Sequence, residues 1–310
     1  MSKNKIKDTD LQMLINNTTY LDYYERLKLL ATSIFSWKNL DKHFGEGAER
    51  FLEIGLFLFG QVVAVNDPKI GLQIFNCNTT NKLNNYYLPT EIIAYSTNYN
   101  KKFNFDDVVL ITNNKLFLPT KNTIDLFSYR LYEIETTTNV NLKALKTPVL
   151  IEGSEKSMLT LKNLYMQYSG NMPVIFSNKD FDLNKKVNVL KTDAPYLLDK
   201  LDDHKQTVWN ECLTFLGINN NNYEKGERLI KDEVNANNEM INYYLNLFWK
   251  ARKDACEKIN EKFLKNSDEK IEVTLNQDII DLLKLDENDI INMGNDNLPE
   301  FQNESEGNNE

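Results

Sequence analysis

Histidine and cysteine are scarce in this sequence of 310 residues, which has two histidines and three cysteines. No CxxC or HxxxH pattern is present, so the ligand spacings of a structural zinc site are missing. Cys77, Cys212 and Cys256 are odd in number and far apart, which predicts buried thiols in a reducing compartment rather than a disulfide framework. A catalytic pair of Cys212 and His204 is disfavoured, because the thiol lies on the apolar stripe of a predicted helix and the imidazole on its polar face.

Phosphate-binding motifs and long apolar runs are absent as well. The sequence has neither GxxxxGK[ST] nor GxGxxG, so we expect no ATP hydrolysis, no enzymatic activity and no bound cofactor. The longest apolar run, residues 54–65, is too short to cross a bilayer and contains two glycines and a glutamine. The N-terminus lacks the apolar core of a signal peptide, and we therefore expect a soluble protein.

Basic residues are missing altogether from the last part of the chain. The formal net charge is −9, and residues 285–310 carry eight acidic groups and no lysine or arginine. The rest of the chain therefore has a net charge of −1 (−9 + 8). A polar, acidic terminus of this kind is typical of a solvated segment, so residues 286–310 are predicted to form a flexible acidic tail.

Apolar periodicity divides the chain into helical and β-like segments. Apolar residues at three- and four-residue spacing predict helices over residues 20–40, 47–60, 120–146, 193–217 and 240–263, with shorter ones over 161–168 and 276–285. Short runs bounded by Asn, Gly and Pro predict strands over residues 61–67, 70–78, 86–96, 106–114, 147–153, 172–178, 187–193 and 270–275. The first four strands are expected to form antiparallel sheet. Because strands and helices do not alternate, the pattern predicts an α+β fold rather than a doubly wound sheet.

Several helix ends carry recognisable signals. Asp193 is predicted as an N-cap with Pro195 in the first turn, and Gly60 and Gly217 are predicted to end their helices. Residues 136–138 are three threonines of poor helix propensity. The helix over residues 120–146 must therefore be held by packing, or it breaks at this point.

The segment "GINNNNYEKGERLIKDEVNANNE", residues 217–239, is poor in apolar residues and separates two amphipathic helices. Polar loops of this length are uncommon in compact domains and are usually functional or disordered. Lys225, Arg228 and Lys231 alternate there with acidic residues, while Lys200 and Lys205 lie on the preceding helix. On spacing alone, such a near-neutral surface is typical of a solvated loop and would bind DNA weakly.

Two pairs of adjacent carboxylates, Asp202-Asp203 and Asp232-Glu233, offer a different hypothesis. Such pairs could hold Mg²⁺ in a nuclease. Adjacent side chains diverge on a helix, however, and such pairs are common on solvated faces. We therefore predict neither a metal site nor catalytic residues, and a metal-dependent nuclease is kept as an alternative.

Longer stretches of the sequence resemble the connector proteins (portal, or upper collar) of short-tailed phages of the phi29 type. The resemblance is carried by "KTPVLI" (146–151), "NLYMQYSGNMPVIF" (163–176), "KTDAPYLLDKL" (191–201), "VWNECLTFLGI" (208–218), "EKGERLIKDEV" (224–234) and "ACEKIN" (255–260). Weaker similarity covers most of the rest, including "LFLPT" (116–120). These ordered, ungapped matches are more specific than any short motif.

The resemblance implies a homo-oligomeric ring, a dodecamer in the family, at one vertex of the virus shell. Double-stranded DNA would pass through its channel during packaging and ejection, and the ring would join head to tail. The implied partners are other copies of this chain, double-stranded DNA, the major capsid protein, the scaffolding protein, the packaging ATPase and the lower collar or tail protein. The implied location is the virion, with the host cytoplasm during assembly. Another ring-forming collar or tail adaptor is a further alternative.

The resemblance also divides the chain into regions. It implies a flexible N-terminal arm (1–18), a stem helix with a β-rich wing (19–118), a long stem helix (119–146), a clip (147–192), a stem helix (193–217), a channel loop (218–239), a wing helix, strand and short helix (240–285) and the tail (286–310). Ring contacts require apolar residues on more than one face of a stem helix. Tyr129, Tyr132 and Phe127 are the candidates.

Within this family the matching loop lines the channel, and basic residues on it face DNA. The resemblance assigns that role to Lys200, Lys205, Lys225, Arg228 and Lys231. This chain has Gly226 where the family can show a second basic residue, which predicts a more flexible and less basic loop. The N-terminal arm holds a packaging RNA in the family type, but here its lysines are interrupted by acidic residues, so use of such an RNA is left open.

Overall fold

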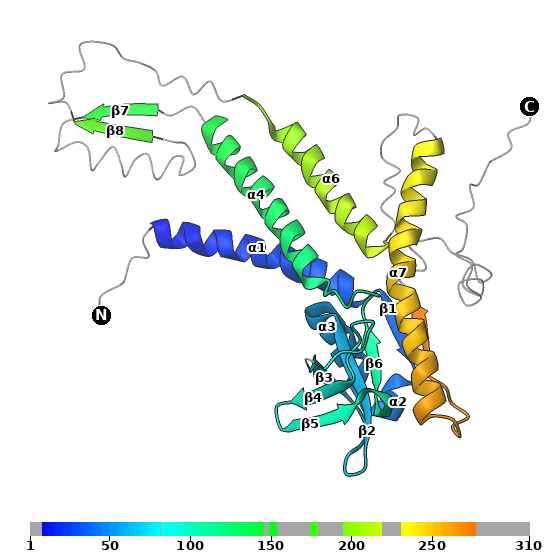
Figure 1. The fold of residues 1–310 in the computed structure, drawn as a ribbon. Coiled ribbons are helices and arrows are strands. Elements are labelled where there is room, and N and C mark those ends of the chain that lie inside the picture. Colours follow the sequence, from blue (N-terminus) through cyan, green and yellow to red (C-terminus); the bar gives the residue numbers. More distant parts are fainter. Residues whose placement is uncertain are drawn as a thin grey trace, which may run out of the picture. The chain divides into compact units, whose positions relative to one another are not determined.

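The computed structural model describes residues 8–80, 82–145, 149–153, 174–178, 195–218 and 231–276. The chain divides into two compact units. Unit 1 comprises Met1–Thr19 and Tyr129–Val208, and unit 2 comprises Tyr20–Ser128 and Trp209–Glu310. The described residues form a mixed fold of helices and strands (Figure 1), as the α+β prediction requires.

A five-stranded antiparallel sheet is the centre of unit 2. Its order is β5-β4-β3-β2-β6. The strands are β2 (Gln61–Asp67), β3 (Gly71–Thr79), β4 (Glu91–Ser96), β5 (Tyr99–Asn104) and β6 (Val109–Thr112). All but β5 were predicted. β5 escapes the sequence pattern because it is a polar edge strand with two lysines, a composition that protects sheet edges from pairing with other chains.

Both faces of this sheet are covered near β2. Val62 to Val65 are all buried, so β2 lacks the alternation of buried and exposed side chains that is typical of a sheet with one face in solvent. Helix α3 (Ala48–Phe59) packs on the face that carries Val62, and Gly55 permits the approach because a Cβ there would lie 2.3 Å from Val62 Cγ1. α3 ends at Gly60, as predicted, in the left-handed conformation that glycine adopts readily.

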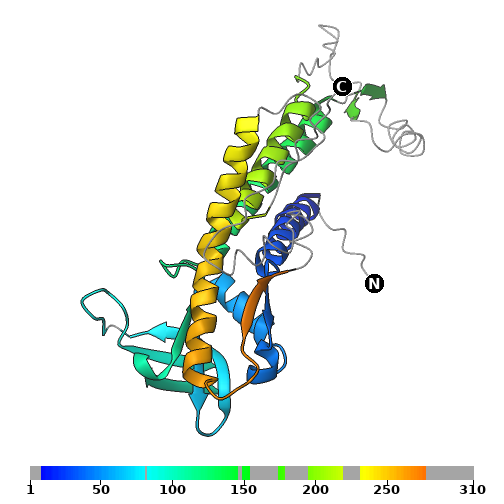
Figure 2. The same ribbon diagram turned by 90° about the vertical axis from the view of Figure 1, so that its right-hand side faces the viewer.

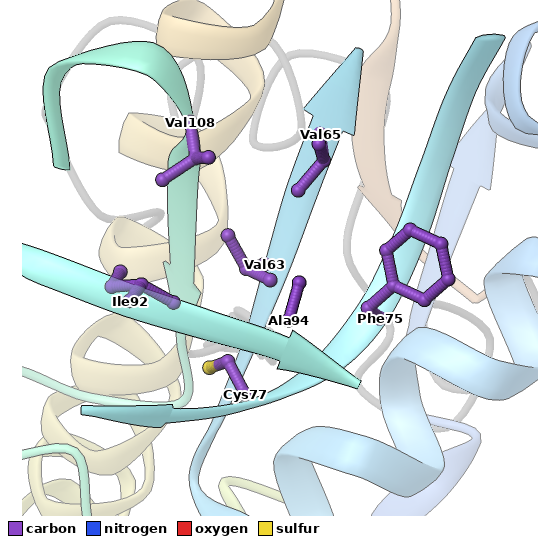
Figure 3. Packing of buried hydrophobic residues seen from close by; sticks show 7 residues of the cluster. All are labelled: Val63, Val65, Phe75, Cys77, Ile92, Ala94 and Val108. Carbon is purple, nitrogen blue, oxygen red and sulfur yellow. The ribbon is translucent and has the colours of Figure 1, made fainter. Parts of the chain in front are cut away.

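The other face of β2 holds a compact apolar cluster. Its members are Val63, Val65, Phe75, Cys77, Ile92, Ala94 and Val108, all buried. Figure 3 shows that β4 crosses over β2, so that Ile92 and Ala94 lie close to Val63. Strands of the same sheet therefore face one another across this cluster, as the twist of the sheet allows.

The sequence prediction was wrong at both ends of the first helix. α1 spans Asp8–Thr32, so much of the predicted flexible arm is helical from Asp8 onward. Beyond Thr32 the expected helix gives way to β1 (Phe35–Lys38), because β1 pairs in antiparallel fashion with β9 (Glu272–Leu275), more than 200 residues away.

α4 (Lys121–Leu145) is continuous through the three threonines. Their hydroxyls donate back to carbonyls one turn earlier: Thr136 and Thr137 to Glu133, and Thr138 to Ile134. Ile124, Leu131 and Ile134 are buried as predicted. Leu142 and Leu145, predicted on the same face, are exposed by 43% and 36%.

The remaining helices differ from prediction at their starts. α6 (Leu198–Leu216) begins five residues after Asp193, so Asp193 cannot be its N-cap, and Asp193 itself lies outside the described residues. A short helix, α2 (Leu40–Phe44), follows β1. α7 spans Lys231–Phe263, so residues 231–239 are helical rather than part of the predicted loop. Ile241, Leu245, Phe248, Ala255 and Ile259 are buried on its expected apolar face, and α7 packs against β6 and β9.

Only two strands of the predicted clip fall within the described residues. β7 (Val149–Gly153) and β8 (Val174–Asn178) pair in parallel, with Val149 opposite Val174. The predicted strand over 187–193, the short helices over 161–168 and 276–285 and the acidic tail lie outside the described residues.

A buried carboxylate, Asp67, ties the turn between β2 and β3 to β5. It accepts hydrogen bonds from Lys101 Nζ (2.8 Å), Tyr99 Oη (2.8 Å) and the Lys69 backbone N–H (2.8 Å). These donors, Lys101 first, hold the pKa of Asp67 well below its ordinary 3.8. Burial and the Asp67 carboxylate together raise the pKa of Tyr99 to about 12.

Unit 2 should consequently lose stability at acidic pH through Asp67. Because the folded pKa lies below the unfolded one, the contribution is complete above pH 3.8 and is lost as the pH falls below it. We expect the free energy of unfolding, measured by urea titration between pH 6 and pH 3, to fall less steeply for Asp67→Asn than for the wild type. The exposed Asp22→Asn variant serves as the control; a wild-type slope in Asp67→Asn would contradict the prediction.

Candidate functional site

Two of the five basic residues expected to face DNA are described, both on α6. Lys200 is exposed. Lys205 is partly buried, and its Nζ lies 2.7 Å from Glu135 Oε2 on α4, with the two side chains 37% and 31% exposed. Within unit 1, Lys205 thus links α6 to α4 and is partly neutralised, which leaves Lys200 as the more accessible cation of the two.

The exposed face of α6 around Lys200 is mainly acidic. Asp199 and Asp203 are exposed on the same side of the helix as Lys200, and Asp202 is exposed further around it. The beginning of the helix is held against α4 by Asn141, whose Nδ2 donates to Pro195 O (2.9 Å) and whose Oδ1 accepts from the Leu197 N–H (3.4 Å). This helix face would repel phosphate more than attract it.

The other basic residues lie in or near the segment that joins α6 to α7. Lys225 and Arg228 lie outside the described residues. Lys231 is the first residue of α7, and its side chain is not among those described. What the structure does place is the two ends of this segment, at Ile218 and Lys231.

The beginning of the segment is held by a close approach between α6 and α7. Gly217 has φ +75° and ends α6: its N–H donates to Thr214 O, and the Ile218 N–H donates to Leu213 O. This is the double hydrogen-bond pattern of a Schellman cap. A Cβ on Gly217 would lie 2.7 Å from Leu245 Cβ and 2.8 Å from its Cα, so the backbone of the cap touches α7 directly.

The alternative chemistries find little support among the described residues. Asp202 and Asp203 are exposed on α6, while the side chains of Asp232 and Glu233 are not described. No group of three or more His, Cys, Asp or Glu that could hold a metal ion occurs in the described part of the chain. Cys212 is buried and His204 exposed, in keeping with the sequence-based interpretation of that pair.

The three thiols behave as core residues. Cys77, Cys212 and Cys256 are free and buried, as predicted. Burial raises the pKa of each thiol to about 12, so the thiolate that a nucleophile needs is not formed at neutral pH. Among the described helices, none is both long and apolar enough to span a membrane.

A buried ion pair at the centre of unit 2 was not predicted from the sequence. Arg252 on α7 and Glu53 on α3 are 3% and 4% exposed, and they form two hydrogen bonds: Nε to Oε1 (2.9 Å) and Nη2 to Oε2 (2.6 Å). Glu53 Oε1 also accepts from Trp37 Nε1 on β1 (2.8 Å). Asn113 Oδ1, after β6, accepts from Arg252 Nη2 (3.3 Å).

The Arg252 guanidinium makes two further contacts with its surroundings. Arg252 Nη1 donates to Phe248 O (3.2 Å), and its guanidinium lies 4.3 Å from the ring centroid of Phe35, within cation–π range. The network therefore joins α3, β1, α7 and the end of β6. The sequence did contain a signal, because Glu53 and Arg252 each occupy a position on the apolar stripe of a helix. That pattern indicates burial but does not show that the two residues pair.

Comparison with known proteins gives the class of this fold. Residues 2–280 match the family model described as Phage Connector (GP10). Among solved structures, the chain is similar to one from the portal and tail of native bacteriophage P68, at 13% identity and TM-score 0.45, covering 88% of this chain and 91% of that one. It is also similar to one from the virion of a native gene transfer agent particle, at 11% identity and TM-score 0.42, covering 85% and 81%.

The match over nearly the whole chain defines a phage connector, the class of protein also called a portal. The chain belongs to the Phage Connector (GP10) family, which is a structural rather than an enzymatic family. This confirms the sequence-based resemblance.

Proposed function

We propose that this connector forms a closed ring, a dodecamer, at one vertex of the phage capsid, and that double-stranded DNA is packaged and ejected through it. Family membership carries the proposal. Closed rings require a head-to-tail contact between unlike surfaces. α4 offers apolar surface for such a contact, because Leu126, Tyr129 and Val140 are exposed by 59%, 53% and 64%.

The candidates for ring contacts divide into two kinds. Tyr129 is exposed and packs against Tyr132, with ring centroids 5.9 Å apart. Phe127 instead lies 6.4 Å from Phe215 within unit 2, so it serves the interior of the subunit. We propose Tyr129 and Tyr132 as contacts with a neighbouring subunit and withdraw Phe127 from that role.

We propose stem, clip and wing regions as follows. α1, α4 and α6 would form the stem around the channel, residues 147–192 the clip, and the sheet with α3 and α7 the wing. The clip would meet the packaging ATPase and later the lower collar or tail protein. The wing would meet the scaffolding and major capsid proteins. The N-terminal arm, which holds a packaging RNA in the family type, is helical here from Asp8. Whether this protein uses such an RNA is left open.

The channel loop is proposed to be residues 218–230, shortened from the sequence-based 218–239 because α7 begins at Lys231. Lys225 and Arg228 would lie on it, and Lys231 at its end. In a ring, one lysine per subunit becomes a circle of charges around one duplex, which contacts phosphates without reading bases. The acidic face of α6 would limit the net attraction, so that the duplex moves rather than sticks.

Replacing residues 219–230 by a short Gly–Ser linker tests this role. Because Gly217 and Leu245 hold α6 and α7 together without the loop, we expect rings with an unchanged number of subunits by native mass spectrometry. DNA retention in packaged heads should fall several-fold, since the phosphate contacts are removed. The charge reversal Lys225→Glu/Arg228→Glu should act in the same direction.

A matched control uses two exposed basic residues outside the proposed channel. Arg50→Glu/Lys69→Glu changes the net charge of the chain by the same amount and should leave DNA retention unchanged. If the linker variant formed no rings, the loop would be required for assembly. The proposal that the loop serves only to contact DNA would then be wrong. A monomeric wild-type protein at all concentrations would refute the ring itself.

A further inference from the structure

A groove in unit 2 runs between α7 and the edge of the sheet at β6. Its volume is about 510 Å³. The floor is apolar and comes from both sides: Leu88, Phe105, Leu110, Phe117, Leu247, Ala251 and Ala255. In Figure 1, β6 and α7 lie side by side along this line, in agreement with their packing. A second hollow continues from it along α7, lined by Phe105, Val108 and Lys265 among others.

Lysines surround this apolar floor. Lys115, Lys250 and Lys258 line the groove, with Asp254 as the acidic residue among its lining, and Lys265 follows one hollow further on. Lys262 is different, because its Nζ donates to Asp106 O and to Val108 O and so holds α7 against the sheet. Within the described part of the chain, the other four ammonium groups have neither an ion pair nor a hydrogen bond.

We propose that the acidic C-terminal tail of the same chain, residues 286–310, docks in this groove. The tail carries eight carboxylates and no basic residue. Between them stand apolar residues: Ile290, Ile291, Met293, Leu298 and Phe301. An acidic segment with apolar anchors is the chemical complement of an apolar floor within a ring of unpaired lysines.

The tail is long enough to reach the groove. β9 ends at Leu275 and packs against α7, as β6 does, on a different side of the helix (Figures 1 and 2). The path from β9 around α7 to the groove is therefore at most about half the circumference of the helix, roughly 16–19 Å. Residues 277–285 alone span up to about 30 Å when extended. The link from β9 to the tail thus exceeds the required distance.

DNA is the other polyanion that a connector meets, and the groove is less suited to it. The floor between the lysines is apolar, whereas a duplex backbone presents phosphates and sugars. Asp254 stands within the groove, and Asp106 and Glu261 line the adjoining hollow. The tail carboxylates are unevenly spaced, so the tail can bind in a position that keeps them away from these acidic groups. The phosphates of a duplex are evenly spaced and cannot avoid them in this way.

Zero-length carbodiimide coupling of the full-length protein, followed by mass spectrometry, tests the proposal. The reagent joins a carboxylate to an amine in contact with it. We expect tail carboxylates to couple to Lys115, Lys250 and Lys258 and not to equally exposed lysines such as Lys69 and Lys143. Coupling spread over all exposed lysines would overturn the proposal. So would frequent coupling of a labelled to an unlabelled subunit in mixed assemblies, since the tail in the groove would then belong to a neighbour.

A binding measurement separates the groove from general charge attraction. A fluorescent peptide of residues 286–310 is titrated onto protein truncated after Leu285. We expect saturable binding that Lys250→Glu/Lys258→Glu weakens about tenfold, the effect of some 1.4 kcal/mol. Lys69→Glu/Lys143→Glu should leave it within twofold. Equal weakening by both variants, or a short DNA duplex that binds more tightly than the peptide and displaces it, would overturn the proposal. None of these outcomes depends on ring or channel function.

Discussion

Arg252→Met should destabilise the protein by about 3–5 kcal/mol, because it leaves Glu53 buried and without its countercharge. Loss of one partner of a buried ion pair costs more than the pair contributes, since the remaining charge has lost both water and partner. Among the residues that the structure describes, Glu53 would retain only the hydrogen bond from Trp37. The measurement is urea unfolding at one fixed protein concentration, because assembly adds a concentration-dependent contribution to stability.

The same substitution at Arg26 is the matched control. Arg26 pairs with Asp22 one turn away on α1, but the side chains are 61% and 48% exposed. Such surface pairs contribute about 0–1 kcal/mol, so Arg26→Met should be nearly neutral. Glu53→Gln/Arg252→Met should recover part of the loss, since the amide removes the buried charge and still accepts from Trp37. A stability of Arg252→Met within about 1 kcal/mol of wild type would contradict this account of the network.

Gly217→Ala is the second large effect, and we expect a loss of about 2–5 kcal/mol. An alanine with φ near +75° costs about 1–2 kcal/mol by itself. Its Cβ would also lie 2.7–2.9 Å from Leu245 Cβ, Cα and N, distances at which backbone has to move. Moving α7 away from the α6 cap would disturb the packing of Cys212 and Leu216, which are buried.

Gly71→Ala isolates the backbone contribution. Gly71 has φ +78° at the turn between β2 and β3, and nothing lies within 4 Å of the position that a Cβ would take there. We expect Gly71→Ala to lower the free energy of unfolding only by the cost of the left-handed conformation for alanine, about 1–2 kcal/mol. The difference between the two variants in the free energy of unfolding then measures the contact with Leu245. If the two variants lost equal stability, that contact would have no energetic role.

The sequence predicted best those elements that depend on interactions between residues close to one another in the chain. α3, α4, β2 and β3 were predicted nearly to their ends, and β4 and β6 fall within longer predicted segments, because their apolar spacing and their glycine or proline boundaries are local. The apolar face of α7 was predicted correctly, but its predicted start was nine residues too late, since Asp, Val and Asn in that part have low helix propensity. Packing on β6 and β9 stabilises the longer helix.

The candidate DNA residues were named by family resemblance and not by local chemistry. The structure adds that Lys205 is paired with Glu135 and that Lys200 stands among three aspartates. The ion pair is not visible in the sequence, because Glu135 and Lys205 are 70 residues apart. The predicted role of Lys225, Arg228 and Lys231 in contacting DNA stays a prediction.

The sequence alone determined which faces of the helices are buried, where most strands lie, and, through its long ordered matches, the connector family. Those properties depend on neighbouring residues and on composition. Only the tertiary structure decided that β1 is a strand, that Arg252 meets Glu53, and that the backbone at Gly217 touches Leu245. Each of these depends on a partner distant in sequence, and local spacing encodes that a side chain is buried without encoding what it is buried against.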